Sequence, residues 1–220
     1  MSQVFVTGGT GYLGRPLIKQ LIERGHVVQV LARQQSVGKV PSGAAVVTGN
    51  ALDASSFASS ILPAETLVHL IGVPHPNPRK AEEFRTIDLA SIKASVIAAR
   101  QAGVRHFVYV SVAHPAPVMQ QYVAVREQGE ALIEDSGISA SILRPWYVLG
   151  PGHRWPYMLL PVYKLFEWFP PTRTTARRLG LVTLRQMVTA LTSVVESPPT
   201  GVRILEVPDI RSAELQAKPA

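Results

Sequence analysis

Three glycines near the start of the chain, Gly8, Gly11 and Gly14, form a GxxGxxG pattern. A short β-rich run at residues 3–7 precedes it, and residues 12–24 follow with apolar side chains at helical spacing. In such a strand–turn–helix unit, the first glycine permits a tight turn, the second lets a diphosphate approach the backbone, and the third lets helix and strand pack closely. The free N–H groups at the helix start attract an anion. The pattern predicts a dinucleotide site, and the alternative is a tight turn without a ligand.

The residue at the end of the second predicted strand distinguishes the two nicotinamide dinucleotides. NAD-binding sheets place a carboxylate there, about 20 residues after the glycines, to hold the ribose 2′-hydroxyl. This chain has Arg33 at that place, and no Asp or Glu occurs between Glu23 and Asp53. A guanidinium can bind a 2′-phosphate through two donors. We therefore predict NADP, with NAD as the less favoured cofactor. The alternative is that Arg33 is an ordinary solvated side chain.

Five segments carry a resemblance to one family: VTGGTGYLG at 6–14, GNALD at 49–53, HLIG at 69–72, VRHFVYVS at 104–111 and LRP at 143–145. The sequence resembles the atypical short-chain dehydrogenase/reductase superfamily, in its NmrA-like NAD(P)-binding branch, which is similar to NAD-dependent epimerases and dehydratases. The resemblance covers residues 1–150 well and the rest loosely. It implies a Rossmann fold and a nicotinamide cofactor. It does not imply catalysis, because the branch includes reductases, complex I accessory subunits and regulators that only bind the cofactor.

The predicted cofactor-binding residues lie mostly at the carboxyl ends of the predicted strands, where ligands bind in such sheets. They are Gly8, Thr10, Gly11, Tyr12, Leu13, Gly14, Arg33, Asn50, Ala51, Ile71, Gly72, Val73, Tyr122, Arg126, Pro145, Trp146 and Tyr147. Asn50 matches the family position that approaches the adenine, and the backbone of residues 71–73 is expected to line the cofactor. Asp53 is instead expected to cap the following helix.

The superfamily performs oxidoreduction with Ser or Thr, Tyr and Lys, and this chain matches that set in part. The resemblance implies Ser111, Tyr122 and Arg126 as the catalytic residues, with Tyr122 as the acid or base. Tyr122 and Arg126 are four residues apart, so they share one face of a helix. Arg replaces the usual Lys, and Val112 stands at a place where the usual hydroxyl can fall. The alternative is that Arg126 forms a surface salt bridge with Glu130.

Aromatic residues are concentrated after the sixth predicted strand. Residues 146–169 hold eight of the fifteen aromatic residues, including all three Trp. Trp146 and Tyr147 can flank a flat acceptor such as a flavin, a quinone or an aromatic ketone, and the alternative is that they form the core of a lobe. Basic residues accompany this segment, so peripheral membrane contact and a homodimer face are further alternatives. Three prolines argue against one long amphipathic helix.

The elements that must position these residues alternate between strand and helix. The predicted strands span 3–7, 26–31, 44–48, 66–71, 106–111, 138–143 and 202–207, and the predicted helices span 12–24, 81–102, 122–136 and 184–195. The predicted fold class is α/β, a Rossmann-type doubly wound parallel sheet with a small C-terminal lobe. We expect one domain. It has a Rossmann core at 1–150, a substrate or interface lobe at 151–200, a returning strand within 201–210 and a frayed tail from residue 212.

The composition excludes several classes of protein. The 220 residues contain no cysteine, which excludes a disulfide scaffold, a thiolate zinc site and a cysteine nucleophile. The six histidines show no ligand spacing with carboxylates, so no metal site is expected. The net charge of +7 suits an anionic partner, NADP accounts for part of it, and no nucleic-acid-binding motif occurs. The start of the chain shows no signal peptide, and no apolar run reaches about 18 residues, so we expect a cytoplasmic protein without a membrane span.

Two functions fit these residues. The first is an NADPH-dependent reductase of a small, flat acceptor, which is a quinone, a flavin or a carbonyl compound. The second is a non-catalytic NADP-binding regulator or assembly factor with a protein partner, which Arg126 and Val112 favour. A sugar epimerase or dehydratase is a third alternative, and the short C-terminal lobe argues against it.

Overall fold

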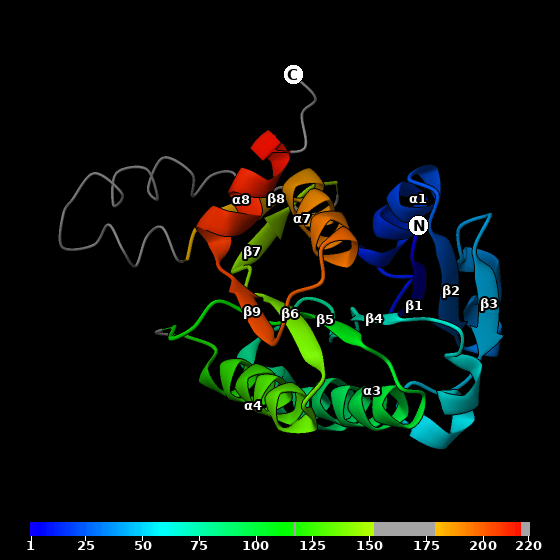
Figure 1. The fold of residues 1–220 in the computed structure, drawn as a ribbon. Helices are drawn as coiled ribbons and strands as arrows, with labels where there is room; N and C mark the ends of the chain where they lie inside the picture. The colour runs from blue at the N-terminus through cyan, green and yellow to red at the C-terminus, as the bar shows by residue number, and fades with distance from the viewer. Residues whose placement is uncertain (117, 152–178, 217–220) are drawn as a thin grey trace.

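Seven parallel strands form one sheet within residues 1–116, 118–151 and 179–216, the part of the chain that the computed structural model describes (Figure 1). Their order is β3-β2-β1-β4-β5-β6-β9. They are β1 (Gln3–Thr7), β2 (Val27–Ala32), β3 (Ala45–Thr48), β4 (Thr66–His69), β5 (His106–Val110), β6 (Ser139–Leu143) and β9 (Val202–Leu205). This is the order of a doubly wound dinucleotide-binding sheet, in which the direction of winding reverses between β1 and β4. The predicted fold class is confirmed.

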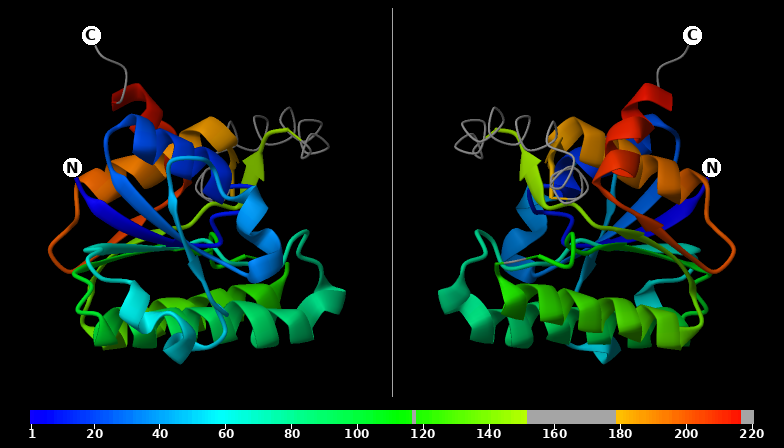
Figure 2. Two further views of the ribbon diagram at one scale, coloured as in Figure 1. Left: turned by 90° about the vertical axis from the view of Figure 1, so that its right-hand side faces the viewer. Right: turned by 90° about the vertical axis from the view of Figure 1, so that its left-hand side faces the viewer.

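Helices cover both faces of the sheet (Figures 1 and 2). One face packs against α1 (Gly14–Glu23), α7 (Leu184–Glu196) and α8 (Val207–Gln216). The other face packs against α3 (Ala90–Gln101) and α4 (Gln120–Ser136). Because side chains alternate along a strand, β1 contributes to both cores: Val4 and Val6 lie on the α1 side, and Phe5 lies on the α3 side.

The helix predicted over 81–102 has a local change of winding. It consists of α2 (Ala81–Glu83), the π-helical turn η5 (Phe84–Leu89) and α3. Short 3-10 helices lie between the other elements: η1 (Gln34–Lys39), η2 (Ala54–Ser56), η3 (Ala58–Ser60) and η4 (Pro78–Lys80). A π-helical turn is rare and often occurs at functional sites.

The C-terminal part differs from the prediction in its tail. The expected frayed tail from residue 212 is wrong for residues 212–216, because α8 continues to Gln216, and residues 217–220 lie outside the described residues. Two short parallel strands pair with each other here: β7 (Tyr147–Leu149) precedes the lobe predicted at 151–200, and β8 (Leu181–Thr183) lies within it. Most of that lobe, residues 152–178, lies outside the described residues. Within the described ranges, no helix is long and apolar enough to cross a membrane.

Candidate functional site

The glycine turn connects β1 to α1 at the carboxyl edge of the sheet. Gly8 has a φ of +75°, and its carbonyl oxygen accepts a hydrogen bond from the N–H of Gly11 at 3.0 Å. A Cβ at Gly8 would lie 2.7 Å from the carbonyl carbon of Leu70, and a Cβ at Gly14 would lie 2.5 Å from the oxygen of Gly8. Leu13, the N-cap of α1, provides no side-chain cap, and the first turn of α1 has no acidic residue. The turn therefore fits a diphosphate, which needs close backbone approach and free N–H groups.

Arg33 leaves the sheet beside the glycine turn. The β1–β2 register pairs Thr7 with Leu31, so the turn and Arg33 follow neighbouring strands at the same edge. Arg33 is exposed and has an extended backbone, with a φ of −70° and a ψ of 148°. The carboxylate of Asp53 accepts the N–H of Ser55 at 3.0 Å, which confirms the predicted capping role of Asp53.

The other residues predicted at the glycine turn and at the ends of β3 and β4 follow strands at this edge of the sheet. Asn50 is exposed, and its Oδ1 accepts the N–H of Leu52 at 3.1 Å. In the loop after β4, Ile71 is half-buried, Gly72 is exposed and Val73 is buried. The half-buried residues at the same edge are Thr10, Tyr12, Leu13 and Ala51.

Arg126 on α4 lies behind the loop that follows β4. Its Nη1 donates to the backbone oxygen of Val110 at 3.1 Å, and its Nη2 donates to Oδ2 of Asp88 at 3.1 Å. Longer contacts of 3.5 Å connect Nη1 to the backbone oxygen of Ile71 and to the hydroxyl of Tyr109. The guanidinium thus joins α4 to the ends of β4 and β5.

The Asp88–Arg126 ion pair is buried, with exposed side-chain fractions of 0% for Asp88 and 6% for Arg126. Burial raises the pKa of Asp88 above its ordinary value, and Arg126 opposes that rise. Burial by itself lowers the pKa of Arg126, but Tyr122, Tyr109 and Asp88 together raise it above its ordinary value. Arg126 therefore carries its charge inside the protein.

Glu130 does not pair with Arg126, so the predicted alternative of an Arg126–Glu130 surface salt bridge is wrong. Both residues are buried. Glu130 instead accepts hydrogen bonds from the Nε and Nη2 of Arg144, the former at 3.1 Å, and lies 3.4 Å from Nε2 of His114. The spacing of four residues on α4 permits an Arg126–Glu130 pair. Instead, Arg126 pairs with Asp88 and Glu130 pairs with Arg144, which both come from other elements.

Tyr122 lies near Arg126, and Ser111 lies directly after β5. Tyr122 is half-buried on the first turn of α4, and its ring centre lies 5.1 Å from the guanidinium carbon of Arg126 and 5.0 Å from the ring centre of Phe84. Ser111 follows β5 and is 3% exposed, and its Oγ has no hydrogen-bond partner among the described residues. Val112 is buried beside it. The Oγ of Ser111 is thus a buried polar atom whose hydrogen-bonding capacity no described residue uses.

Residues 145–147 follow β6 at the same edge. Pro145 is buried, and its oxygen accepts the N–H of Ala113 at 3.0 Å. Trp146 and Tyr147 are half-buried, and Tyr147 pairs with Leu181 in the small sheet. The remaining aromatic residues of the predicted segment, at 155–169, lie outside the described residues.

A comparison with protein families identifies the family of this chain. Residues 8–154 match the profile of a family described as NAD(P)H-binding. The chain belongs to this NAD(P)H-binding family. The match begins at the glycine turn and continues beyond Tyr147, so it contains every residue predicted to bind the cofactor.

Relatives of this NAD(P)H-binding chain include two reductases. A ceramide reductase of Caulobacter vibrioides is 28% identical over 212 residues, which cover 94% of this chain and 65% of that protein. The 4-hydroxy-2-methyl-3-oxo-4-farnesyl-3,4-dihydroquinoline-1-oxide ketoreductase of Stigmatella aurantiaca is 27% identical over 170 residues, which cover 67% of this chain and 51% of that protein. The chain thus spans less than two thirds of the length of either relative.

Solved structures support the fold. The Bordetella bronchiseptica enzyme WbmH in complex with NAD+ has a TM-score of 0.70 at 19% identity, covering 100% of this chain and 83% of that one. A short-chain dehydrogenase/reductase superfamily protein of Agrobacterium tumefaciens with bound NAD has a TM-score of 0.68 at 18% identity, covering 93% and 77%. These likenesses show the predicted Rossmann-type fold, and the family match gives NAD(P) as the cofactor class.

The sequence prediction missed Asp88 and Tyr109. The chain carried a usable signal for Asp88, because it lies four residues after Phe84 and four before Ile92, which are both buried. A carboxylate on an apolar helix face predicts a buried cation as its partner. Tyr109 has no such signal, since a tyrosine within a buried strand is ordinary core.

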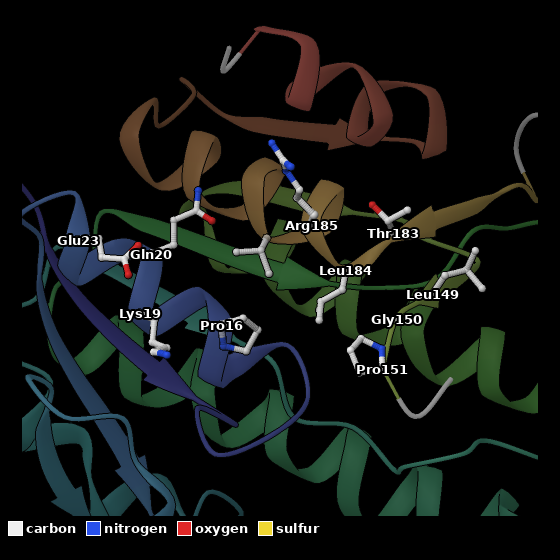
Figure 3. Close-up of a pocket in the computed structure, with 11 residues that line it drawn as sticks. Pro16, Lys19, Gln20, Glu23, Leu149, Gly150, Pro151, Thr183, Leu184 and Arg185 are labelled. Carbon is white, nitrogen blue, oxygen red and sulfur yellow. The ribbon is translucent and has the colours of Figure 1, made fainter. Parts of the chain in front are cut away.

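A groove of about 510 Å³ lies between α1 and α7 (Figure 3). It is lined by Pro16, Lys19, Gln20, Glu23, Leu149, Gly150, Pro151, Thr183, Leu184, Arg185 and Val188. The glycine turn, Arg33 and the loop after β4 do not line it. Within the described ranges, no three His, Asp or Glu residues are grouped as metal ligands.

Proposed function

We propose that this protein is an NADPH-dependent reductase of a small, flat acceptor, a carbonyl compound, a quinone or a flavin. The observation that carries the proposal is the common sheet edge where the glycine turn, Arg33, Ser111 and Tyr122 all lie. The turn suits a diphosphate, because it leads into the N-terminus of α1, whose first turn carries no acidic residue that would repel an anion. Bound NADPH would supply the hydride.

The preference for NADPH over NADH rests on charge at the end of β2. An exposed guanidinium follows this strand, and no carboxylate lies between Glu23 and Asp53 to hold a free 2′-hydroxyl. The Asp53 carboxylate is engaged with Ser55. Arg33 can therefore receive a 2′-phosphate through two charge-assisted hydrogen bonds.

Two hydroxyl groups at the carboxyl edge act on the acceptor. The Oγ of Ser111 donates a hydrogen bond to the acceptor atom that gains charge, since it has no partner among the described residues. The hydroxyl of Tyr122 gives the proton that completes a two-electron reduction, and solvent returns that proton. Trp146 and Tyr147 provide apolar surface for a flat molecule. The names of the two reductase relatives support reduction as the reaction class.

The test is NADPH oxidation by the purified chain with an aromatic ketone, a quinone and a free flavin. We expect turnover with at least one acceptor class. Tyr122→Phe is expected to lower kcat by about 10²–10⁴-fold, the usual contribution of a general acid, while the variant still binds NADPH. Absence of NADPH binding by the wild-type chain would overturn the proposal.

A second candidate, a non-catalytic NADP-binding regulator or assembly factor, is favoured by one observation. Arg126 replaces the usual Lys, and its Nη groups contact Asp88 and the backbone oxygens of Val110 and Ile71. NADPH binding without turnover of any acceptor, together with a protein partner that co-purifies, would favour this candidate.

A further inference from the structure

One carboxylate contacts both the guanidinium of Arg126 and the loop after β4. Oδ2 of Asp88 accepts a hydrogen bond from Nη2 of Arg126 at 3.1 Å, and Oδ1 accepts the N–H of Val73 at 2.8 Å. Gly72 precedes Val73 in this loop, and a Cβ at Gly72 would overlap Nη2 of Arg126. Each oxygen of Asp88 thus has its own partner, and the loop passes so close to the guanidinium that a side chain at position 72 would displace Nη2 of Arg126.

The pair also connects separate elements of the sheet edge. Asp88 comes from the π-helical turn η5 and Arg126 from α4, and Arg126 contacts the backbone oxygens of Ile71 and Val110. In the strand order, β4 and β5 lie on one side of β1, and β2 with Arg33 lies on the other. A dinucleotide crosses such a sheet at β1, so the pair belongs to the half of the crevice opposite Arg33.

We propose that Asp88 is a positioning residue of the cofactor crevice. Together with Arg126 it holds residues 71–73 in the conformation that receives the nicotinamide half of NADP(H). Arg126 acts from behind this loop and supplies positive charge next to Tyr122. The inference rests on the proposed function, because it assumes that the crevice binds NADP(H).

The test compares NADPH with 2′,5′-ADP, which has the adenosine half and its phosphates but no nicotinamide half. Asp88→Asn keeps the size of the side chain but replaces one acceptor oxygen by a donor, so it cannot accept both hydrogen bonds. Titration calorimetry should show the Kd for NADPH rising about tenfold or more, the effect of one lost charge-assisted contact. The Kd for 2′,5′-ADP should stay within about twofold.

Hydrogen exchange gives a readout independent of turnover. In the wild type, the N–H of Val73 is held by Asp88, and in Asp88→Asn its exchange should accelerate about tenfold or more. A double variant, Asp88→Asn with Arg126→Met, removes both buried charges, so it folds without an unpaired charge. It should retain the fast exchange at Val73 and the weakened binding of NADPH.

Glu65→Gln is the matched control, since Glu65 forms an exposed ion pair with Arg105 at the start of β5, at the opposite edge. It should change neither Kd nor the exchange at Val73. Equal weakening of NADPH and 2′,5′-ADP in Asp88→Asn would show a general structural role and overturn the inference. Unchanged NADPH binding and Val73 exchange would also overturn it. A wild type that binds neither ligand would instead overturn the proposed function.

Discussion

The carboxylate of Glu130 on α4 accepts hydrogen bonds from the guanidinium of Arg144 at the end of β6. The side chains are 6% and 15% exposed, and Arg144 also lies 3.3 Å from Glu206 at the start of the α8 segment. This pair joins α4 to the strand that leads into residues 145–147. It therefore places Trp146 relative to the helix that carries Tyr122.

Removal of Glu130 is expected to destabilise the fold strongly. Glu130→Ala leaves a mostly buried guanidinium without its main partner, and we expect the free energy of unfolding to fall by about 3 kcal/mol. Urea denaturation measures this change. Glu65→Ala, at the exposed pair with Arg105, should cost no more than about 1 kcal/mol. Equal losses in the two variants would contradict a stabilising role for burial of the Glu130 pair.

Gly14→Ala is expected to disrupt the glycine turn. The new Cβ would lie 2.5 Å from both the oxygen of Gly8 and the Cα of Gly9, which are backbone atoms that cannot move alone. We expect a loss of about 1–3 kcal/mol in stability, the usual cost of overpacking, and loss of NADPH binding. Thermal unfolding and calorimetry measure the two effects. Gly38→Ala is the control, because a Cβ there would meet no atom within 4 Å. Unchanged NADPH binding in Gly14→Ala would contradict the diphosphate site.

Acid is expected to destabilise the protein through His69. This side chain is 1% exposed, with Nδ1 lying 3.0 Å from the hydroxyls of Thr7 and Ser95. Burial, with a smaller effect of the charge on Arg126, lowers the pKa of His69 to about 3 from the ordinary 6.5. As the pH falls, the imidazole of His69 therefore binds a proton in the unfolded chain at a higher pH than in the folded protein. The contribution of His69 to the free energy of unfolding is complete above about pH 6.5. It falls by about 1.4 kcal/mol per pH unit as the pH decreases toward about 3.

Urea unfolding at several pH values checks this dependence. His69→Asn should reduce the slope of stability against pH between about pH 6 and pH 4 by the equivalent of one proton. Burial lowers the pKa of His106 to about 4, so His106 contributes in the same direction over a narrower range. An unchanged slope in His69→Asn would show that other groups cause the acid sensitivity.

Arg33→Ala is expected to remove the proposed preference for NADPH over NADH. The loss of a charge-assisted contact should weaken NADPH binding by about 10–100-fold and leave NADH binding within about twofold. Calorimetric titrations with both cofactors measure the ratio. Arg100→Ala is the control, since Arg100 is also exposed but lies in the last turn of α3. Equal weakening of NADPH and NADH would argue against a 2′-phosphate contact.

The features that could be predicted from the sequence are local. The glycine turn, the alternation of strands and helices and the place of Arg33 depend on neighbours within one or two elements, and the structure places them as expected. The π-helical turn was missed, because η5 lies within a continuous helical pattern. The helix over the tail was also missed, because α8 gains stability from packing against the core rather than from its own pattern.

By itself, the sequence determined the glycine turn and the strands and helices of definite period, so that Arg33 and Ser111 follow parallel strands at the same edge of the sheet. Only the tertiary structure decided the partners of the buried charges. Arg126 lies 38 residues from Asp88, and Glu130 lies 14 from Arg144. A buried charge is costly unless it is paired, so each charged group pairs with whichever opposite charge the fold brings to it, regardless of distance along the chain.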